Sequence, residues 1–435
     1  MPWGGGRQVV LPGSRGVTDP RGAHIVKHRI VVLGAGYAGA YVAGTLARRL
    51  SAADTEVTVV NAEPDFVQRL RLHQLAAGQE IAAPALSEVF AGTGVRLLPA
   101  RVTAVEPERR VVAVDGAGCG AAELGYDTVV YALGSHGARH AVPGAADHAF
   151  DVSARPSALL LRERLDGLAR RGAGGRVLVV GDGLTGIETA TEIAEFRPGL
   201  SVTLVARGEL GATLSAGARE HLRRACDRLG VTVREHAEVA AVEAARVRCA
   251  DGTLLETDAT VWTAGFAVSP IAAAGGLDVT EDGRITVDRA MRSVSHPDVY
   301  AVGDCAFAIG DNGRPLPMSC ASAGYTGRQA AEAITARLTG RKAPKNVKLG
   351  YLGNHISLGR RDGILQIVDH EARPKPAFLA GRKAARVKEA IVAMSLWGTS
   401  HPTFGVPQRR HRLTGEPYAA DAADADEAAR LRAHR

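Results

Sequence analysis

Short β-branched runs alternate with longer stretches rich in alanine and leucine along most of the chain. The run 29–33 is followed by helical spacing at 38–51, and the run 176–180 is followed by helical spacing at 185–196. Short apolar runs bounded by turn residues are typical of buried strands, and their alternation with helical segments is typical of parallel sheets with crossover helices. The pattern therefore predicts an α/β fold.

The pattern occurs twice, as two copies of one module. A second strand follows each opening unit, at 56–61 and at 201–206, and a hairpin with a final strand closes each module, within 111–135 and 247–262. Self-similarity on this scale indicates that a whole module is repeated.

The segment after residue 283 has no glycine-rich turn of its own. We expect it to return to the first module, so that the second module is inserted in the first, with a small α+β domain at the C-terminus. The expected boundaries are a disordered leader, 1–27; a first dinucleotide-binding domain, 28–152 and 283–340; a second one, 153–282; a C-terminal domain, 341–407; and a tail, 408–435.

Each module opens with a glycine-rich turn between its first strand and first helix, GAGYAG at 34–39 and GDGLTG at 181–186. In such turns the first glycine permits the tight bend, the second lets the backbone approach a pyrophosphate, and the third allows close helix–strand packing. One match would be weak, but two matches in the strand–turn–helix context predict that the chain binds two dinucleotides.

Composition narrows the function classes. No run approaches 18 apolar residues, so no membrane-spanning helix is expected. The five cysteines are scattered without a C-x-x-C pair, which argues against a disulfide framework and fits a reducing, cytoplasmic setting. The net charge is +7, but the basic stretches lack interleaved aromatic residues, so no nucleic-acid partner is expected. No metal site is expected either.

The motifs GAGYAG, GDGLTGIE, YALGS, WTAGF and VYAVGDCA together resemble those of flavoprotein reductases that bind two dinucleotides. Over roughly residues 28–340 the chain resembles the type II NADH dehydrogenase-like branch of the pyridine nucleotide-disulfide oxidoreductases. The resemblance implies that the first domain binds FAD and that the second binds NADH or NADPH. It also implies that a hydride passes from NAD(P)H to FAD, and that an acceptor then takes the electrons.

The resemblance assigns cofactor contacts to individual residues. Asp304 matches the aspartate that holds the ribityl chain of FAD, and Val102 matches a backbone contact to adenine. Asn61 stands where an acidic residue usually holds the adenosine ribose, and an asparagine still accepts a hydroxyl. The expected cofactor-binding residues are Gly34, Gly36, Tyr37, Ala38, Gly39, Asn61, Val102, Ala132, Gly134, Gly181, Gly183, Leu184, Thr185, Gly186, Glu188, Arg207, Gly265, Gly303, Asp304 and Ala321.

The second module departs from the usual pattern at the end of its second strand. Ala206 stands where an acidic residue would select NADH, and Arg207 follows directly. The missing carboxylate and the nearby guanidinium favour a 2′-phosphate, so we expect NADPH to be preferred.

The candidate catalytic residues are Glu188, His73 and Arg71. In the family, the glutamate equivalent to Glu188 lies at the nicotinamide–flavin contact, where it would steer the carboxamide or exchange a proton with the flavin; a glutamate in a first helical turn would otherwise only complement the helix dipole. Disulfide reductases pair this glutamate with a lysine beside their redox cysteines, an element missing here. Within 66–78, Arg69, Arg71 and His73 form a cationic cluster expected against the flavin ring, in which His73 would protonate an acceptor oxygen. The alternative is a basic surface helix.

The acceptor side departs furthest from the resemblance. The two glutamines of the family's quinone motif have no counterpart at the aligned positions of MSCASAGYTGRQA, 318–330. A quinone or quinone-like molecule stays the expected small-molecule acceptor. A pathway-specific metabolite, a ferredoxin partner, and a signalling role like that of apoptosis-inducing factor stay open.

The segment 381–398 has the pattern of a basic amphipathic helix, with apolar residues at helical spacing from Ala384 to Trp397. Such a helix can lie in a membrane interface, which would make the protein a peripheral one on the cytoplasmic face. It can equally cover the FAD module or form a homodimer contact.

Overall fold

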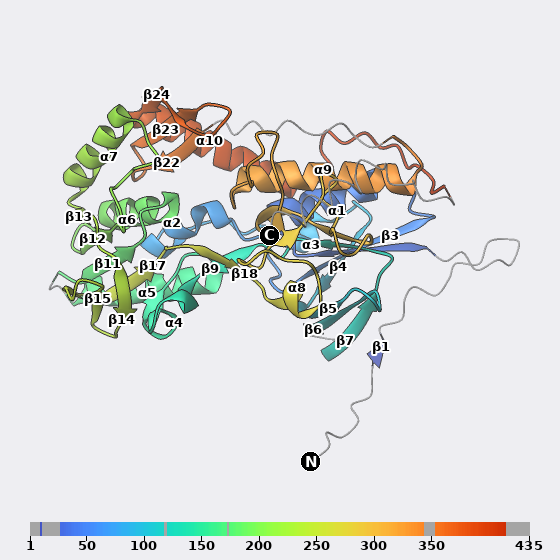
Figure 1. The fold of residues 1–435 in the computed structure, drawn as a ribbon, viewed down its shortest axis with the longest axis horizontal. Coiled ribbons are helices and arrows are strands. Elements are labelled where there is room, and N and C mark those ends of the chain that lie inside the picture. Colours follow the sequence, from blue (N-terminus) through green and yellow to red (C-terminus); the bar gives the residue numbers. More distant parts are fainter. Residues whose placement is uncertain (1–8, 11–26, 117–119, 172–173, 343–352, 415–435) are drawn as a thin grey trace, which may run out of the picture.

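The computed structural model describes residues 9–10, 27–116, 120–171, 174–342 and 353–414. Two parallel five-stranded sheets organise them, with the strand orders β20-β8-β2-β3-β4 and β10-β17-β11-β12-β13 (Figure 1). The two orders correspond strand by strand from the central strands β2 and β11 outward, which confirms the repeated module and the α/β fold.

The first sheet takes its edge strand from far along the chain. β20 pairs in parallel with β8, although the whole second module separates them in sequence. The second module is therefore inserted in the first, as predicted. The strands of this sheet are β2 (His28–Leu33), β3 (Thr55–Asn61), β4 (Val95–Pro99), β8 (Thr128–Tyr131) and β20 (Val299–Ala301). Helix α1 (Tyr37–Arg49) joins β2 to β3, and α9 (Cys320–Leu338) packs against α1.

The second sheet repeats this arrangement. Its strands are β10 (Ala149–Phe150), β11 (Arg176–Val180), β12 (Ser201–Val205), β13 (Thr232–Arg234) and β17 (Ala259–Trp262). Helix α6 (Leu184–Phe196) joins β11 to β12, and α5 (Arg155–Arg170) and α7 (Ala216–Leu229) complete the module. The central strands of both sheets are buried along most of their length, which explains why they read as continuous apolar runs.

Antiparallel hairpins extend both modules. They are β5 (Arg101–Glu106), β6 (Val111–Gly116) and β7 (Gly120–Gly125) in the first, and β14 (Val239–Val242), β15 (Arg246–Cys249) and β16 (Leu254–Glu256) in the second. One short ladder crosses between the modules, because β9 (Ser135–Gly137) pairs with β18 (Phe266–Val268). The remaining short elements are β19 (Ile285–Thr286), β21 (Ala306–Phe307), α3 (Leu86–Val89), α4 (Ala145–His148), α8 (Ile271–Ala274) and the 3₁₀ turns η2 (Arg139–Ala141) and η3 (Gly303–Cys305).

The C-terminal part is a three-stranded antiparallel sheet followed by a helix: β22 (Gly353–Ser357), β23 (Gly363–Val368), β24 (Pro374–Ala380) and α10 (Gly381–Ser400). Ile356, Leu358 and Ile364 join the hydrophobic core of the second module. Helix α10 leaves this sheet and reaches α1 of the first module. The C-terminal part therefore connects the two modules (Figure 1).

The described residues of both chain ends contact the first module. In the leader, Val9–Val10 (β1) pairs in parallel with β7, whose outer edge is otherwise unpaired; the other leader residues, 1–8 and 11–26, lie outside the described part. In the tail, His411 forms a β-bridge with Leu50, and Arg412 pairs with Asp54 at 3.0 Å. The start of the tail is therefore attached to the α1–β3 connection.

Candidate active site

A cavity of about 1260 Å³ lies between the two parallel sheets, where both glycine turns face it. The turns follow the carboxyl ends of β2 and β11, which is where open α/β sheets bind their ligands. The β9–β18 ladder, the turn η3 and the start of α9 complete the wall.

The first turn needs two of its three glycines for the fold alone. Gly34 has φ +98°, and a Cβ there would lie 2.5 Å from the Ala132 carbonyl oxygen. A Cβ on Gly39 would lie 2.0 Å from the Gly34 carbonyl oxygen. Gly36 is different, because a Cβ there would meet nothing within 4 Å. Its bare backbone at the start of α1 faces the cavity, which suits a pyrophosphate that must come close to the amides.

The second turn has the same construction. Gly181 has φ +115°, and a Cβ on Gly186 would lie 1.8 Å from the Gly181 carbonyl oxygen. A Cβ on Gly183 would again meet nothing within 4 Å, at the start of α6. In each turn the protein leaves one glycine cradle that a side chain would fill, so the residues present fit two dinucleotides.

Most of the expected cofactor-binding residues lie in the wall of the cavity: Gly34, Gly36, Tyr37, Ala38, Asn61, Val102, Ala132, Gly134, Gly181, Gly183, Leu184, Thr185, Glu188, Arg207, Gly265, Gly303 and Asp304. Gly39 and Gly186 lie behind the wall, against the first glycine of each turn. Ala321 is exposed and lies outside the wall, because α9 turns Cys320 and Ala323 toward the cavity instead.

Asn61 and Asp304 are already engaged with neighbouring groups. The Asn61 Oδ1 accepts a hydrogen bond from the Ala35 amide at 2.9 Å, so this side chain holds the first glycine turn. The Asp304 carboxylate accepts a hydrogen bond from the Ser135 hydroxyl at 2.7 Å and lies 3.7 Å from the Arg69 guanidinium. The bond from Asn61 fixes the turn, and the Asp304 carboxylate lies where the wall meets α9.

The cationic segment 66–78 is not one regular helix. It forms a 3₁₀ turn, η1 (Arg69–Arg71), followed by α2 (Leu72–Ala77). Arg69 lies in the cavity wall and donates to the Ser135 carbonyl and hydroxyl oxygens at 2.5 and 2.8 Å. Arg71 lies outside the wall, where it donates to Gln74 and pairs with Glu389. The change of helix type thus turns the two arginines in different directions.

His73 lies in the wall, and its side chain is buried, with only 4% of the residue exposed. Its Nε2 has no hydrogen-bond partner. Burial lowers the pKa of His73 to about 4, so the imidazole is neutral at pH 7. A neutral imidazole accepts a proton more readily than it donates one, which weakens the expected role of His73 as the acid for an acceptor oxygen.

Glu188 is buried just past the first turn of α6, which begins at Leu184, and has a cationic partner. Its Oε1 accepts from the Ser357 amide at 2.9 Å and lies 3.0 Å from the Lys388 ammonium. Burial would by itself raise the pKa of Glu188, but Lys388, together with His73 and the Ser357 amide, holds it below its ordinary value. The Lys388 Nζ also donates to the His355 carbonyl at 3.0 Å.

Lys388 is the residue that sequence reasoning missed. The lysine that disulfide reductases place beside their redox cysteines is missing from the first module. A different lysine, on α10 and 200 residues after Glu188 in the sequence, pairs with this glutamate instead. Ala384 and Val392, four residues to either side, are buried, so Lys388 lies on the inner face of α10. The sequence could have indicated this, because Lys388 lies at helical spacing from the apolar residues Ala384 and Val392 and so shares their face of the helix.

The described cysteines are free thiols that burial keeps protonated. Burial raises the pKa of Cys305, which donates to the Tyr131 and Val302 carbonyls, and that of Cys320, which lies in the wall, to about 12. Thiolate chemistry at neutral pH is therefore disfavoured at both positions.

The outer face of α10 and the following turn expose large apolar side chains. Met394 is 73% exposed and Phe404 is 68% exposed, and Val387, Ile391 and Trp397 lie on the same stretch. The apolar series read from the sequence therefore faces outward, apart from Ala384. In the described ranges, no helix combines the length and the hydropathy needed to cross a membrane.

Comparisons with known proteins agree with this geometry. The family model described as pyridine nucleotide-disulphide oxidoreductase matches residues 28–327. An NADH dehydrogenase-like protein of Mycobacterium tuberculosis is 35% identical over 327 residues, which span 69% of this chain and 78% of that protein. A type II NADH:quinone oxidoreductase of Staphylococcus epidermidis is 27% identical over 85% of this chain and 96% of its own. The structure of NDH2 from Plasmodium falciparum in complex with NADH has a TM-score of 0.73 at 15% identity, covering 88% of this chain and 98% of that one.

Proposed function

The chain belongs to the pyridine nucleotide-disulphide oxidoreductase family and is an NADH dehydrogenase-like flavin oxidoreductase; from this premise we propose that its electron acceptor is a quinone. The observation that carries the proposal is the buried Glu188–Lys388 pair in the wall of the cavity. Reduction of a quinone consumes two protons as well as two electrons, so an ammonium group in the wall suits this acceptor.

We assign FAD to the first module and NAD(P)H to the second. Bound FAD would take a hydride from NAD(P)H and pass the electrons on to the acceptor. The Gly36 and Gly183 cradles would hold the two pyrophosphates, and Asp304 would hold the ribityl hydroxyls. Ala206 and Arg207 support a preference for NADPH, since the end of β12 offers a guanidinium and no carboxylate to the adenosine ribose.

Each residue of the buried pair has a distinct task in this proposal. Lys388 would donate a proton to an acceptor oxygen and take one back from solvent, and the Glu188 carboxylate would hold the ammonium at the wall and favour its charged form. The neutral His73 would accept a hydrogen bond from a bound ligand, because its Nε2 has no partner within the protein. The wall contributed by Ser319 and Cys320 replaces the family's glutamines, so recognition of the quinone would rest mainly on Lys388.

We also propose that the protein binds a membrane surface through α10, where a lipophilic acceptor is available. The exposed Met394, Trp397 and Phe404 supply an apolar ridge, and Arg382 and Lys383 at the start of the helix are exposed and cationic. Flotation with anionic liposomes tests this, and a variant with Met394, Trp397 and Phe404 replaced by serine should stay at the bottom of the gradient. Equal flotation of both proteins would contradict the membrane proposal.

The acceptor is tested by stopped-flow spectroscopy of the FAD-loaded protein. NADH or NADPH reduces the yellow protein anaerobically, and the reduced protein is then mixed with a short-chain quinone, a ferredoxin or oxygen. We expect the quinone to restore the flavin absorbance fastest. Faster reoxidation by ferredoxin or oxygen would overturn the assignment of the acceptor.

A further inference from the structure

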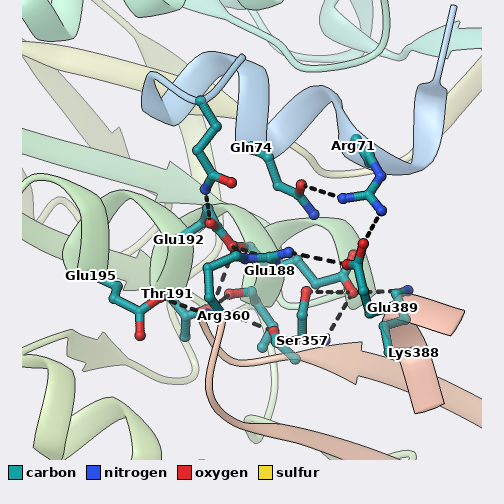
Figure 2. Close-up of polar contacts among 12 residues, drawn as sticks. Arg71, Gln74, Glu188, Thr191, Glu192, Glu195, Ser357, Arg360, Lys388 and Glu389 are labelled. Atoms are coloured by element: carbon teal, nitrogen blue, oxygen red, sulfur yellow. Dashed lines mark hydrogen bonds and ion pairs between the residues drawn. The ribbon is translucent and has the colours of Figure 1, made fainter. Parts of the chain in front are cut away.

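Glu389, the residue after Lys388, connects two arginines from different parts of the chain. It pairs with Arg71 of η1, and its other carboxylate oxygen lies 3.8 Å from the guanidinium of Arg360, in the turn between β22 and β23. Figure 2 shows the three side chains converging beside Lys388 and Glu188. We call Arg71, Arg360 and Glu389 the clamp.

The Arg360 side of the clamp is anchored on α6. The Arg360 guanidinium donates to the Glu192 carboxylate at 3.0 and 2.6 Å, and its backbone amide donates to Glu195 at 2.5 Å. Glu192 is fully buried and also accepts a hydrogen bond from Gln79. Separating Arg360 from Glu192 would leave a buried carboxylate without its cationic partner, so the position of Arg360 is costly to change.

The acidic face of α6 thus holds α10 at two successive residues. Glu188 and Glu192 are four positions apart and lie on one face of α6, and Glu195 follows three positions later. Glu188 pairs with Lys388 directly, while Glu192 and Glu195 reach Glu389 through Arg360 (Figure 2). Successive residues of a helix point about 100° apart, so fixing Lys388 and Glu389 together fixes the rotation of α10 about its axis.

We propose that Glu389 is a positioning residue which, through Arg71 and Arg360, fixes the rotation of α10 and so keeps the Lys388 ammonium at the cavity wall. This inference rests on the proposed role of Lys388 toward the acceptor. The groups that face Lys388 from the packed elements are Glu188 on α6, His73 on α2, His355 on β22 and Cys320 on α9. The clamp adds a second restraint, at the neighbouring residue Glu389, against a rotation that withdraws the ammonium.

The clamp also gives Arg71 a role other than the one expected from the sequence. Arg71 lies outside the wall, yet through Glu389 it is connected to Lys388. The Arg71 side chain is 16% exposed, and the Glu389 side chain is 52% exposed. An ion pair with one exposed partner contributes little to stability. Loss of the pair should therefore leave the protein folded while it loosens the position of α10.

The test is the variant Glu389→Gln in the FAD-loaded protein, followed through both half-reactions. We expect FAD retention and the rate of reduction by NAD(P)H to match the unaltered protein, and reoxidation by a short-chain quinone to slow by roughly tenfold, since small displacements of a reacting group cost this much or more. Glu389→Asp, which keeps the charge, should restore most of the rate. The control is Arg361→Gln, because Arg361 is exposed and follows Arg360 directly.

A second measurement separates positioning from a general structural effect. In a Lys388→Met background, Glu389→Gln should slow reoxidation no further, because the residue through which it acts is gone. Multiplicative losses in the double variant would overturn the proposal, as would unchanged reoxidation in Glu389→Gln alone. The Lys388→Met variant is therefore measured first. If its flavin is reoxidised at the normal rate, the proposed role of Lys388 is wrong, and the role of Glu389 that rests on it is wrong as well.

Discussion

The helices that follow the two glycine turns occupy equivalent places and carry very different side chains. In α1 the positions that correspond to Glu188 and Glu192 of α6 are Tyr41 and Thr45, counted from the third glycine of each turn. Helix α1 packs against α9, where Gly327 lies next to Ala38 and Val42. Helix α6 instead presents a row of carboxylates to the C-terminal part.

This difference shows how a duplicated scaffold acquires two functions. Both turns offer the same glycine cradle, so the repeat itself provides binding of a dinucleotide in each module. The acidic face of α6 adds electrostatic contacts to Lys388 and Arg360, which bring the C-terminal elements to the cavity. In our proposal the acceptor side of the site is therefore built on the second module's helix, while the first module's helix contributes its N-terminal cradle and packing.

The equivalence of the cradles is tested most strongly by placing valine at the second glycine of each turn. Both positions have backbone angles open to valine, φ −72° at Gly36 and −68° at Gly183, and a Cβ meets nothing there, so folding should survive. Gly36→Val should purify colourless. Gly183→Val should stay yellow, while its KM for NAD(P)H rises by roughly a hundredfold or more, since the side chain blocks the amides.

The matched control for both variants is Gly199→Val, because Gly199 is exposed, has open space around its Cα and lies outside the cavity wall. It should bind both dinucleotides normally. Retention of FAD by Gly36→Val, measured by the absorbance of the purified protein, would show that the two turns are not equivalent binding sites.

The next largest effect should be confined to one of the two half-reactions, the reoxidation of the flavin by the acceptor. Lys388→Met removes the ammonium and leaves both glycine turns intact. We expect reoxidation by a quinone to fall by about a hundredfold, in the range found for a lost general acid, while reduction by NAD(P)H changes little. Single-turnover absorbance measures both rates. Equal slowing of the two half-reactions would mean that Lys388 acts on the nicotinamide side, and Lys383→Gln on the exposed face of α10 is the control.

The comparison also marks what the sequence was able to predict. The parallel sheets, the insertion and the family all followed from local patterns, because strand runs and glycine turns are encoded within a few residues. The domain boundaries stay a prediction. The Glu188–Lys388 pair was missed because it joins residues 200 positions apart, and pairing across that separation leaves no periodicity to read. Arg71 contacts Glu389 and lies outside the cavity wall, where a 3₁₀ turn replaces the regular helix over 69–71, and its catalytic role stays a prediction.

The buried His73 should make the stability of the folded protein depend on pH. Its pKa is about 4 in the folded protein and 6.5 ordinarily, so between these values the unfolded chain binds more protons and folding becomes less favourable as pH falls. The shift of 2.5 pKa units (6.5 − 4) corresponds to a loss on the order of 3 kcal/mol between pH 7 and pH 4. His73→Met, which cannot titrate, should lose less stability over this range when urea midpoints are compared. His370→Gln serves as the control, because that side chain is 85% exposed. Parallel losses in His73→Met and the unaltered protein would contradict the neutral imidazole.

The smallest effect concerns one of the places where the two turns differ in their hydrogen bonds. In each module the first glycine of the turn donates its amide hydrogen to a carbonyl near the end of the neighbouring strand, that of Val60 or Val205. The residues that follow are Asn61 and Ala206. Of these two, Asn61 also accepts a hydrogen bond from its turn, through its side chain. Under the proposed preference for NADPH, the guanidinium of Arg207 would hold the 2′-phosphate. Arg207→Ala should lower kcat/KM for NADPH roughly tenfold, about 1.4 kcal/mol, and leave the value for NADH nearly unchanged. Steady-state kinetics with both nucleotides measure this, with the exposed Arg248→Ala as the control for a lost positive charge. A tenfold preference of the unaltered enzyme for NADH would show that the space beside Arg207 does not hold a phosphate.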